Sequence, residues 1–304
     1  MTLEDEILQE LQHLSVEKHK DETKTTFHPK YDPMYYSNLI WNSSSYEDVA
    51  QIQVALIPVE NDDQRDLFDF IRHTISSMPQ CQIPGRVLSV LVHDQRLNRF
   101  LGIIQLTTDL LKSEFKDEFI GFDEKKRGPL KKHIRDHSAN LSICVPVQPF
   151  GFDFCGGKLL AMLSFSTELH DLYQRRYSKS LALITTTSIH GKSIQYDRLK
   201  QLKFIGYTKG YDLNYPKFNA KKQSKWQALR FLTTQLNIDS HQVFNHGNQR
   251  GIYCGWTGTN AKEFLLRQRA DFNKDKLQPV DEIATFWKVR WAKQRSAHLN
   301  RDRT

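Results

Sequence analysis

The sequence predicts an α/β protein built on a mixed, mostly antiparallel sheet with flanking helices. Residues 141–210 alternate β-prone apolar runs with helical patterns, in the order strand, loop, helix, strand, short helix, strand. Residues 86–93 and 100–106 are two further strand-like runs, and the short polar connection between them indicates an antiparallel hairpin. Hydrophobic residues make up 39% of the chain, which is enough for a packed core.

Three parts are expected along the chain. Residues 1–45 are predicted to be a peripheral, helical N-terminal segment, because a narrow apolar stripe and a polar connector precede the first strand. Residues 46–210 form the predicted core, within which the charged residues 109–140 are a largely helical insertion. Residues 211–304 form a basic, tryptophan-containing helical extension.

Local patterns predict the elements of the core and of the last helix. An apolar run at 53–59 is the first strand, and a helix with one apolar face follows it. After the hairpin come a strand at 141–147, a helix at 158–177 and a short strand at 181–184. The final helix begins near Pro279. The apolar faces consist of Leu67, Phe68, Ile71 and Ile75 in the first helix, and Ile283, Phe286, Trp287 and Trp291 in the last.

Composition narrows the classes of function. The net charge of +8 and the pI of about 9.2 favour an anionic partner, and nucleic acid is the commonest one. No apolar run approaches the ~20 residues that cross a bilayer, and the acidic N-terminus lacks the pattern of a secretory signal. We therefore expect a cytoplasmic protein without membrane association. Its scattered cysteines are expected to be reduced thiols: Cys81, Cys144, Cys155 and Cys254.

The positive charge concentrates in the C-terminal third. No acidic residue lies between Asp212 and Asp239, although five basic residues do, and the final helix adds more. Cations next to tryptophans can contact phosphates and stack on unpaired bases. A solvated basic face and a helix docked through Trp287 and Trp291 are the alternative interpretations of these residues. The candidates for nucleic-acid contact are Lys221, Lys222, Lys225 and Arg290.

A glycine-containing loop precedes the predicted helix at 158–177. Residues 148–157 include the adjacent Gly156 and Gly157, and the helix follows at once. Free backbone amides and the positive end of the helix dipole meet at such a helix start, so it can hold a pyrophosphate. This loop therefore favours a cofactor-binding enzyme.

These residues resemble two known groups of proteins. The order of elements in 53–210 is similar to the GNAT superfamily of N-acetyltransferases, and Gln148-Pro-Phe-Gly151 resembles the first half of its pyrophosphate loop. Over roughly half of the chain the motifs also resemble Druantia A-type defence proteins and, more distantly, phage Mom-type DNA-modifying acyltransferases. Those motifs are Gly156-Gly-Lys-Leu-Leu-Ala161, Thr187-Ser-Ile-His-Gly191, Tyr196 and Gly206-Tyr-Thr-Lys-Gly210.

The resemblance implies an acyltransferase-like enzyme that modifies a nucleic-acid base, with acyl-coenzyme A as donor. The acceptor side then needs a base whose pKa is near neutral and a hydrogen-bond donor for the leaving thiolate. The candidates there are Ser188, His190 and Tyr196. Backbone amides that polarise the carbonyl and loop residues that hold the donor are predicted at Val145, Val147, Gly151, Gly156, Gly157 and Lys158. No spacing predicts a metal site.

Two departures from the family pattern keep other functions open. Asp153 stands at the position of the second small residue of the family's loop. Leu202 stands at the position where the family has the tyrosine that acts as the general acid. His190 can be a turn residue beside Gly191, and Tyr196 can be a packing residue. The alternatives are a non-catalytic nucleic-acid-binding protein of a phage or anti-phage system, and an N-acyltransferase for small molecules or proteins.

Overall fold

The computed structural model describes residues 28–75, 85–109, 114–122, 127–188, 191–208 and 250–302. Its described strands form one seven-stranded sheet in the order β1-β2-β3-β4-β5-β7-β6. The strands are β1 (Val54–Pro58), β2 (Val87–Asp94), β3 (Arg99–Thr108), β4 (Ser138–Pro146), β5 (Leu183–Ser188), β6 (Lys203–Tyr207) and β7 (Gly251–Trp256).

The pairing of the strands confirms the predicted fold class and the predicted hairpin. Strands β2 and β3 are antiparallel, as the short polar connection between them indicated. All other neighbours in the sheet are antiparallel as well, except β4 and β5, which run parallel. The sheet is therefore mixed and mostly antiparallel, and its parallel pair lies near the centre.

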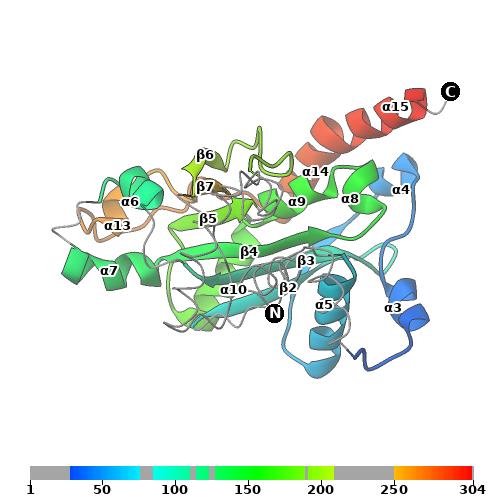
Figure 1. Cartoon of the computed structure of the whole chain (residues 1–304), viewed down its shortest axis with the longest axis horizontal. Coiled ribbons are helices and arrows are strands. Elements are labelled where there is room, and N and C mark those ends of the chain that lie inside the picture. Colours follow the sequence, from blue (N-terminus) through cyan, green and yellow to red (C-terminus); the bar gives the residue numbers. More distant parts are fainter. Residues whose placement is uncertain are drawn as a thin grey trace, which may run out of the picture.

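Helices lie on both faces of the sheet (Figure 1). Helix α5 lies on one face, where its Arg65 donates a hydrogen bond to Ser89 of β2. Helix α9 lies on the other face, where Gly102 of β3 is so close to Leu160 of α9 that an added Cβ would meet that side chain. The helices are α3 (Pro33–Leu39), α4 (Tyr46–Ala50), α5 (Asp62–Ile75), α6 (Glu114–Ile120), α7 (Arg127–Asp136), α8 (Phe150–Asp153), α9 (Gly156–Leu163), α10 (Thr167–Tyr177), α13 (Ala261–Leu265), α14 (Val280–Trp287) and α15 (Lys293–Asp302). Among the described residues, no helix has the length and apolar character needed to cross a membrane.

The helix predicted at 158–177 is two helices, α9 and α10. The side chain of Ser166 accepts a hydrogen bond from the amide of Leu169 and so caps α10. A serine side chain that satisfies a free amide favours a new helix start over continuation. The short helix predicted around Tyr196 is instead a series of turns, and β4 begins at Ser138, three residues before the predicted strand.

Strand β7 joins the C-terminal part of the chain to the core sheet. The sequence pattern predicted no strand there, yet β7 pairs with β5 over its whole length and with β6 on its other side. Gly251 and Gly255 weaken its β-prone pattern, because glycine lacks the side chain that marks a strand. Both glycines are needed, since a Cβ on either would lie 2.3 Å from a backbone carbonyl oxygen.

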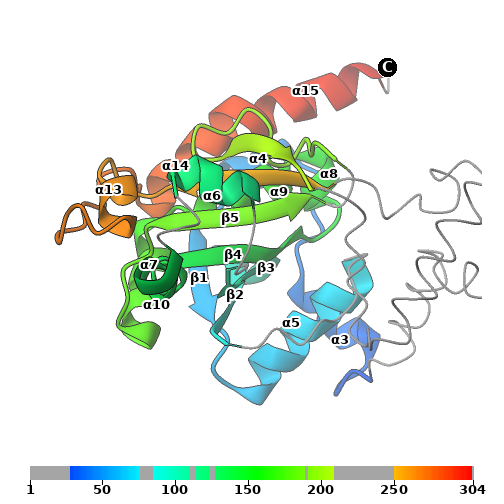
Figure 2. The same cartoon turned by 60° about the vertical axis from the view of Figure 1, so that its left-hand side comes forward.

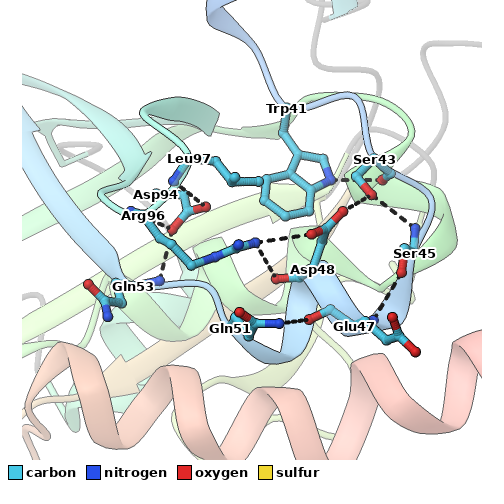
Figure 3. Close-up of polar contacts among 10 residues, drawn as sticks. All are labelled: Trp41, Ser43, Ser45, Glu47, Asp48, Gln51, Gln53, Asp94, Arg96 and Leu97. Atoms are coloured by element: carbon cyan, nitrogen blue, oxygen red, sulfur yellow. Dashed lines mark hydrogen bonds and ion pairs between the residues drawn. The ribbon is translucent and has the colours of Figure 1, made fainter.

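The described part of the N-terminal segment is packed against the sheet. Tyr36 and Trp41 are fully buried in the main core, although this segment was predicted to be peripheral. Figure 3 shows Arg96, in the β2–β3 turn, pointing toward Asp48 of α4, with Nη2 3.2 Å from Oδ1. The neighbouring Asp94 is fully buried and accepts hydrogen bonds from backbone amides at the end of the hairpin.

The final helical stretch docks on the core as one of the sequence alternatives expected. Trp287 of α14 is fully buried, and its indole Nε1 donates to the carbonyl of Cys155 over 3.1 Å. A π-helical turn, η2 (Lys288–Ala292), then leads into α15, which contacts α8 (Figure 2). The three described cysteines are free thiols, in agreement with their scattered spacing: Cys144, Cys155 and Cys254.

Candidate functional site

The parallel strands β4 and β5 separate shortly after they meet. They pair at only three positions, from Ser138 and Leu183 to Asn140 and Thr185. Beyond that point β4 continues to Pro146 and β5 to Ser188 without pairing with each other. In open α/β sheets, ligands bind in a crevice at the carboxyl ends of the strands, and the separation of β4 and β5 lies at the carboxyl ends of both.

Residues of the following turn occupy this separation. Gln195 donates from Nε2 to the carbonyl of Cys144 over 2.9 Å, which is a bond that a paired strand would otherwise make. Thr186 donates from Oγ1 to the carbonyl of Leu141 over 2.8 Å, and its side chain is also hydrogen-bonded to that of Tyr196. The two β4 carbonyls are therefore satisfied by side chains rather than by a neighbouring strand.

Lys158 holds the same turn in place from the start of α9. The residue is 4% exposed, and its ammonium donates to the carbonyls of Ile194 and Asp197. Burial lowers the pKa of Lys158; the nearby Cys155 and Asp197 raise it, and Arg198 and Arg290 lower it. This ammonium has carbonyl oxygens as its direct partners and other cations close by.

Tyr253 of β7 completes the attachment of the turn. Its hydroxyl accepts from the amide of Ser193 and donates to a carboxylate oxygen of Asp197, both over 2.9 Å. Burial raises the pKa of Tyr253 to about 12 and also raises the pKa of Tyr196. Tyr196 therefore stays protonated at neutral pH, so it can donate a hydrogen bond but cannot act as a base.

The glycines predicted to hold a donor lie inside the packing at the start of α9. A Cβ on Gly157 would lie 3.0 Å from the side chain of Gln195, and a Cβ on Gly156 would lie 2.3 Å from Phe150. A Cβ on Gly151 would lie 2.7 Å from Gln148. Gln195 thus covers the helix start at which the sequence placed an anion.

A group of cations and rings lies next to this turn, and we call it the basic face. Arg290 lies over the ring of Trp291, and the ammonium of Lys158 also lies over that ring, 4.4 Å from its centroid. Arg295 lies over the 62%-exposed ring of Phe152 and donates to the Phe152 carbonyl. The basic face consists of Arg198, Arg290, Arg295, Phe152 and Trp291, around the buried Lys158.

Other predicted site residues occupy different surroundings. Ser188, at the end of β5, is 7% exposed and lies opposite Gly251 of β7. Val145 is half-buried opposite Ile103, and the amide of Val147 donates to the carbonyl of Leu101 over 2.9 Å. The structure joins Lys158 to the turn that carries Tyr196, and to Arg290 through Trp291. The predicted residues His190, Lys221, Lys222 and Lys225 lie outside the described residues.

The opposite face of the sheet carries a buried polar cluster that the sequence analysis missed. Asp109 accepts from the ammonium of Lys116 over 3.0 Å and from the hydroxyl of Thr185 over 2.7 Å. All three residues are less than 7% exposed. Farther along this face, Ser89 accepts from Gln105, whose Oε1 accepts from Ser142. Polar residues at alternate positions of otherwise apolar strands were the available signal.

No cluster of metal-ligand type is found among the described residues, in the sense of three or more His, Cys, Asp or Glu side chains placed to hold an ion. The described site offers backbone and side-chain amides, hydroxyls and cations. These groups orient and bind anionic or carbonyl-bearing molecules.

Comparisons with known proteins give one family. Residues 2–266 match the family model of Druantia protein DruA. A Druantia protein DruA of Escherichia coli (strain UMEA 4076-1) is 26% identical over 272 residues, which covers 77% of this chain and 66% of the relative. The matched region thus spans slightly less than two thirds of that relative's length. No solved structure matches.

Proposed function

Because the chain belongs to the Druantia protein DruA family, we propose that it acts on nucleic acid in phage defence and binds the nucleic-acid backbone with its basic face. The observation that carries this proposal is the gathering of like charges around Lys158. Lys158 and Arg290 both lie over the ring of Trp291. Arg198 is also near enough to lower the pKa of Lys158, although burial, Cys155 and Asp197 affect that pKa more, and Arg295 lies near the adjacent Cys155. Cations that repel one another are stabilised when an anion binds among them.

The surrounding residues strengthen this potential. No acidic residue occurs between Glu282 and Asp302, so η2 and nearly all of α15 carry only positive charge. Asp197 is the nearest acid, and its carboxylate accepts from Tyr253. A row of phosphates is the common ligand for a surface of this kind, because each Lys or Arg that neutralises a phosphate releases a counterion condensed on the nucleic acid.

The rings of the basic face add a second kind of contact. Phe152 exposes most of its ring at the tip of α8, with Arg295 over it. Aromatic rings beside a basic track stack on unpaired bases and contribute about 1–3 kcal/mol per base. We therefore expect single-stranded DNA to bind at least as tightly as a duplex of the same sequence.

Fluorescence anisotropy with labelled single-stranded and duplex DNA tests the basic face. The double variant Arg198→Glu/Arg290→Glu is expected to bind about tenfold more weakly or worse at low salt. The matched control is Arg176→Glu/Arg269→Glu, which reverses the same amount of charge at exposed residues elsewhere. Equal losses in both variants would mean that net charge alone drives binding and that the basic face is not the site.

Acyl transfer to a nucleic-acid base is a second candidate function. The separation of β4 and β5 favours it, because the side chains of Gln195 and Thr186 donate to two β4 carbonyls there. An acyl-coenzyme A that enters this separation would displace Gln195 and bring its pyrophosphate to the start of α9. Ser188, His190 and Tyr196 would then lie on the acceptor side, with Tyr196 as a hydrogen-bond donor.

Calorimetry with acetyl-coenzyme A separates the two candidates. Gln195→Ala removes the covering side chain and is expected to bind the donor more tightly than the parent chain does. Gly157→Glu places a carboxylate at the same helix start and is expected to abolish binding. If none of the three proteins binds at millimolar concentrations, the acyl-transfer candidate is wrong, whereas DNA binding through the basic face would stand.

A further inference from the structure

Strand β1 is an edge of the sheet, and within the described residues no strand pairs with its outer side. The amide of Val59 donates to the carbonyl of Ser89, and the amide of Gln95 donates to that of Gln53. Along an antiparallel strand, the backbone amide and carbonyl groups of every second residue point toward the neighbouring strand. Those of residues 53, 55, 57 and 59 therefore point toward β2. The amide and carbonyl groups of Val54 and Leu56 therefore point away from the sheet.

An open groove lies beside this edge. Its volume is about 840 Å³, and its floor includes three consecutive residues of β1, from Val54 to Leu56. A strand edge presents consecutive residues in this way, whereas a strand face presents alternate ones. The walls are α10, along most of its length, and the start of α14. Glu168 joins these two helices by accepting from the amide of Val280 over 3.1 Å.

The charge of the groove is opposite to that of the chain. Three acidic residues line it, Glu168, Asp171 and Asp281, together with one basic residue, Arg175. Asp171 pairs with Lys274 over 3.3 Å, and 62% of its side chain is still exposed. A net acidic rim on a protein of charge +8 attracts a positively charged ligand and repels a second copy of the same groove.

We propose that this groove binds an extended, positively charged segment of a second protein, which adds to the sheet as a strand beside β1. Val54 and Leu56 would each exchange two backbone hydrogen bonds with that segment. Basic side chains of the segment would face the acidic rim. Pro58 has no amide hydrogen, so the pairing ends there, and the contact stays short.

Titration calorimetry with two synthetic peptides tests the proposal. One peptide alternates Lys and Val over six residues, and the other alternates Glu and Val. The Lys peptide is expected to bind the full chain at least tenfold more tightly than the Glu peptide does. In the complex, hydrogen exchange at the amides of Val54 and Leu56 is expected to slow.

Leu56→Pro is the decisive variant. It removes the outward amide without removing any bond to β2, and proline is tolerated at such edge positions. We expect it to bind the Lys peptide at least tenfold more weakly, whereas Leu56→Ala keeps the amide and retains binding. The Arg198→Glu/Arg290→Glu variant is also expected to bind the peptide normally, because the groove is independent of the basic face.

Three results would overturn the inference. Equal binding of the peptide by Leu56→Pro and Leu56→Ala would exclude strand addition. Equal binding of the Lys and Glu peptides would exclude the acidic rim as the source of selectivity. A concentration-dependent dimer in sedimentation that Leu56→Pro abolishes would assign the edge to a second copy of this chain.

Discussion

Two lysines are buried to the same degree on opposite faces of the central sheet, and their partners differ. Lys116 is 5% exposed and pairs with the carboxylate of Asp109. Lys158 is 4% exposed, and its ammonium donates to two backbone carbonyls while Arg198 and Arg290 lie nearby. Burial alone therefore does not distinguish a lysine that completes an ion pair from one that lies beside other cations.

The difference lies in charge compensation. A buried ammonium with a carboxylate partner forms a neutral unit that has little left to offer a ligand. The Lys158 ammonium donates to carbonyls rather than to a carboxylate, although Asp197 is near enough to raise its pKa, and it adds to the potential of the cations around it. We therefore assign Lys116 to the stability of the core and Lys158 to the basic face and to the turn at residues 193–197.

The largest expected effect is the loss of stability in Lys116→Met. The substitution removes the ammonium that pairs with the buried carboxylate of Asp109, so the free energy of unfolding should fall by about 3–5 kcal/mol. Urea unfolding followed by circular dichroism measures this loss. A loss below about 1 kcal/mol would mean that the ion pair is not needed to compensate Asp109.

Lys158→Met should cost less, about 1–2 kcal/mol in the free energy of unfolding. The variant loses two hydrogen bonds to carbonyls but also removes a buried charge, so the two effects partly offset each other. The same urea experiment gives the comparison with Lys116→Met. If Lys158→Met were the more destabilised of the two, the contrast between the lysines would be wrong.

Gln195→Ala is expected to lower the free energy of unfolding by about 1 kcal/mol. It removes the hydrogen bond to the Cys144 carbonyl, which water can then replace because the residue is only half-buried. Hydrogen exchange should become faster around residues 193–197 and stay unchanged in α6. Unchanged exchange in the turn would show that Lys158 and Tyr253 hold it without Gln195.

The smallest effect concerns pH. The pKa of Lys158 is lowered in the folded chain, so as the pH rises toward 10.5 the folded state loses this proton before the unfolded state does. The unfolded state then binds more protons, and stability increases with pH. The free energy of unfolding of the parent chain should therefore rise relative to Lys158→Met between pH 8 and 10.5. A difference between them that does not change over this range would contradict the lowered pKa.

Much of the fold could be predicted from the sequence. The strands at 53–59, 86–93 and 100–106 were found because alternation and apolar runs are local signals. Strand β7 was missed because two of its six residues are glycines, which the fold requires at close backbone approaches that only the tertiary structure reveals. The burial of Trp41 was also missed, because the residues that pack around it lie far away in the sequence.

The candidate site was less predictable than the fold. The glycines and Lys158 were recognised as the start of a helix, but nothing local indicates that Gln195 covers them from 38 positions further along the chain. The pair Lys116 and Asp109 lies in a charged stretch that resembles a solvated insertion. Only the packing of α6 on the sheet shows that these two charges are buried together.

The salt dependence of DNA binding tests the central claim most directly. The logarithm of the dissociation constant, measured by anisotropy against the logarithm of salt concentration, reports how many phosphates the protein contacts. The slope for Arg198→Gln/Arg290→Gln should be shallower than that of the parent chain by about 1 to 2 units, while Arg176→Gln/Arg269→Gln keeps the parent slope. Equal slopes for all three proteins would contradict the assignment of the basic face as the nucleic-acid site.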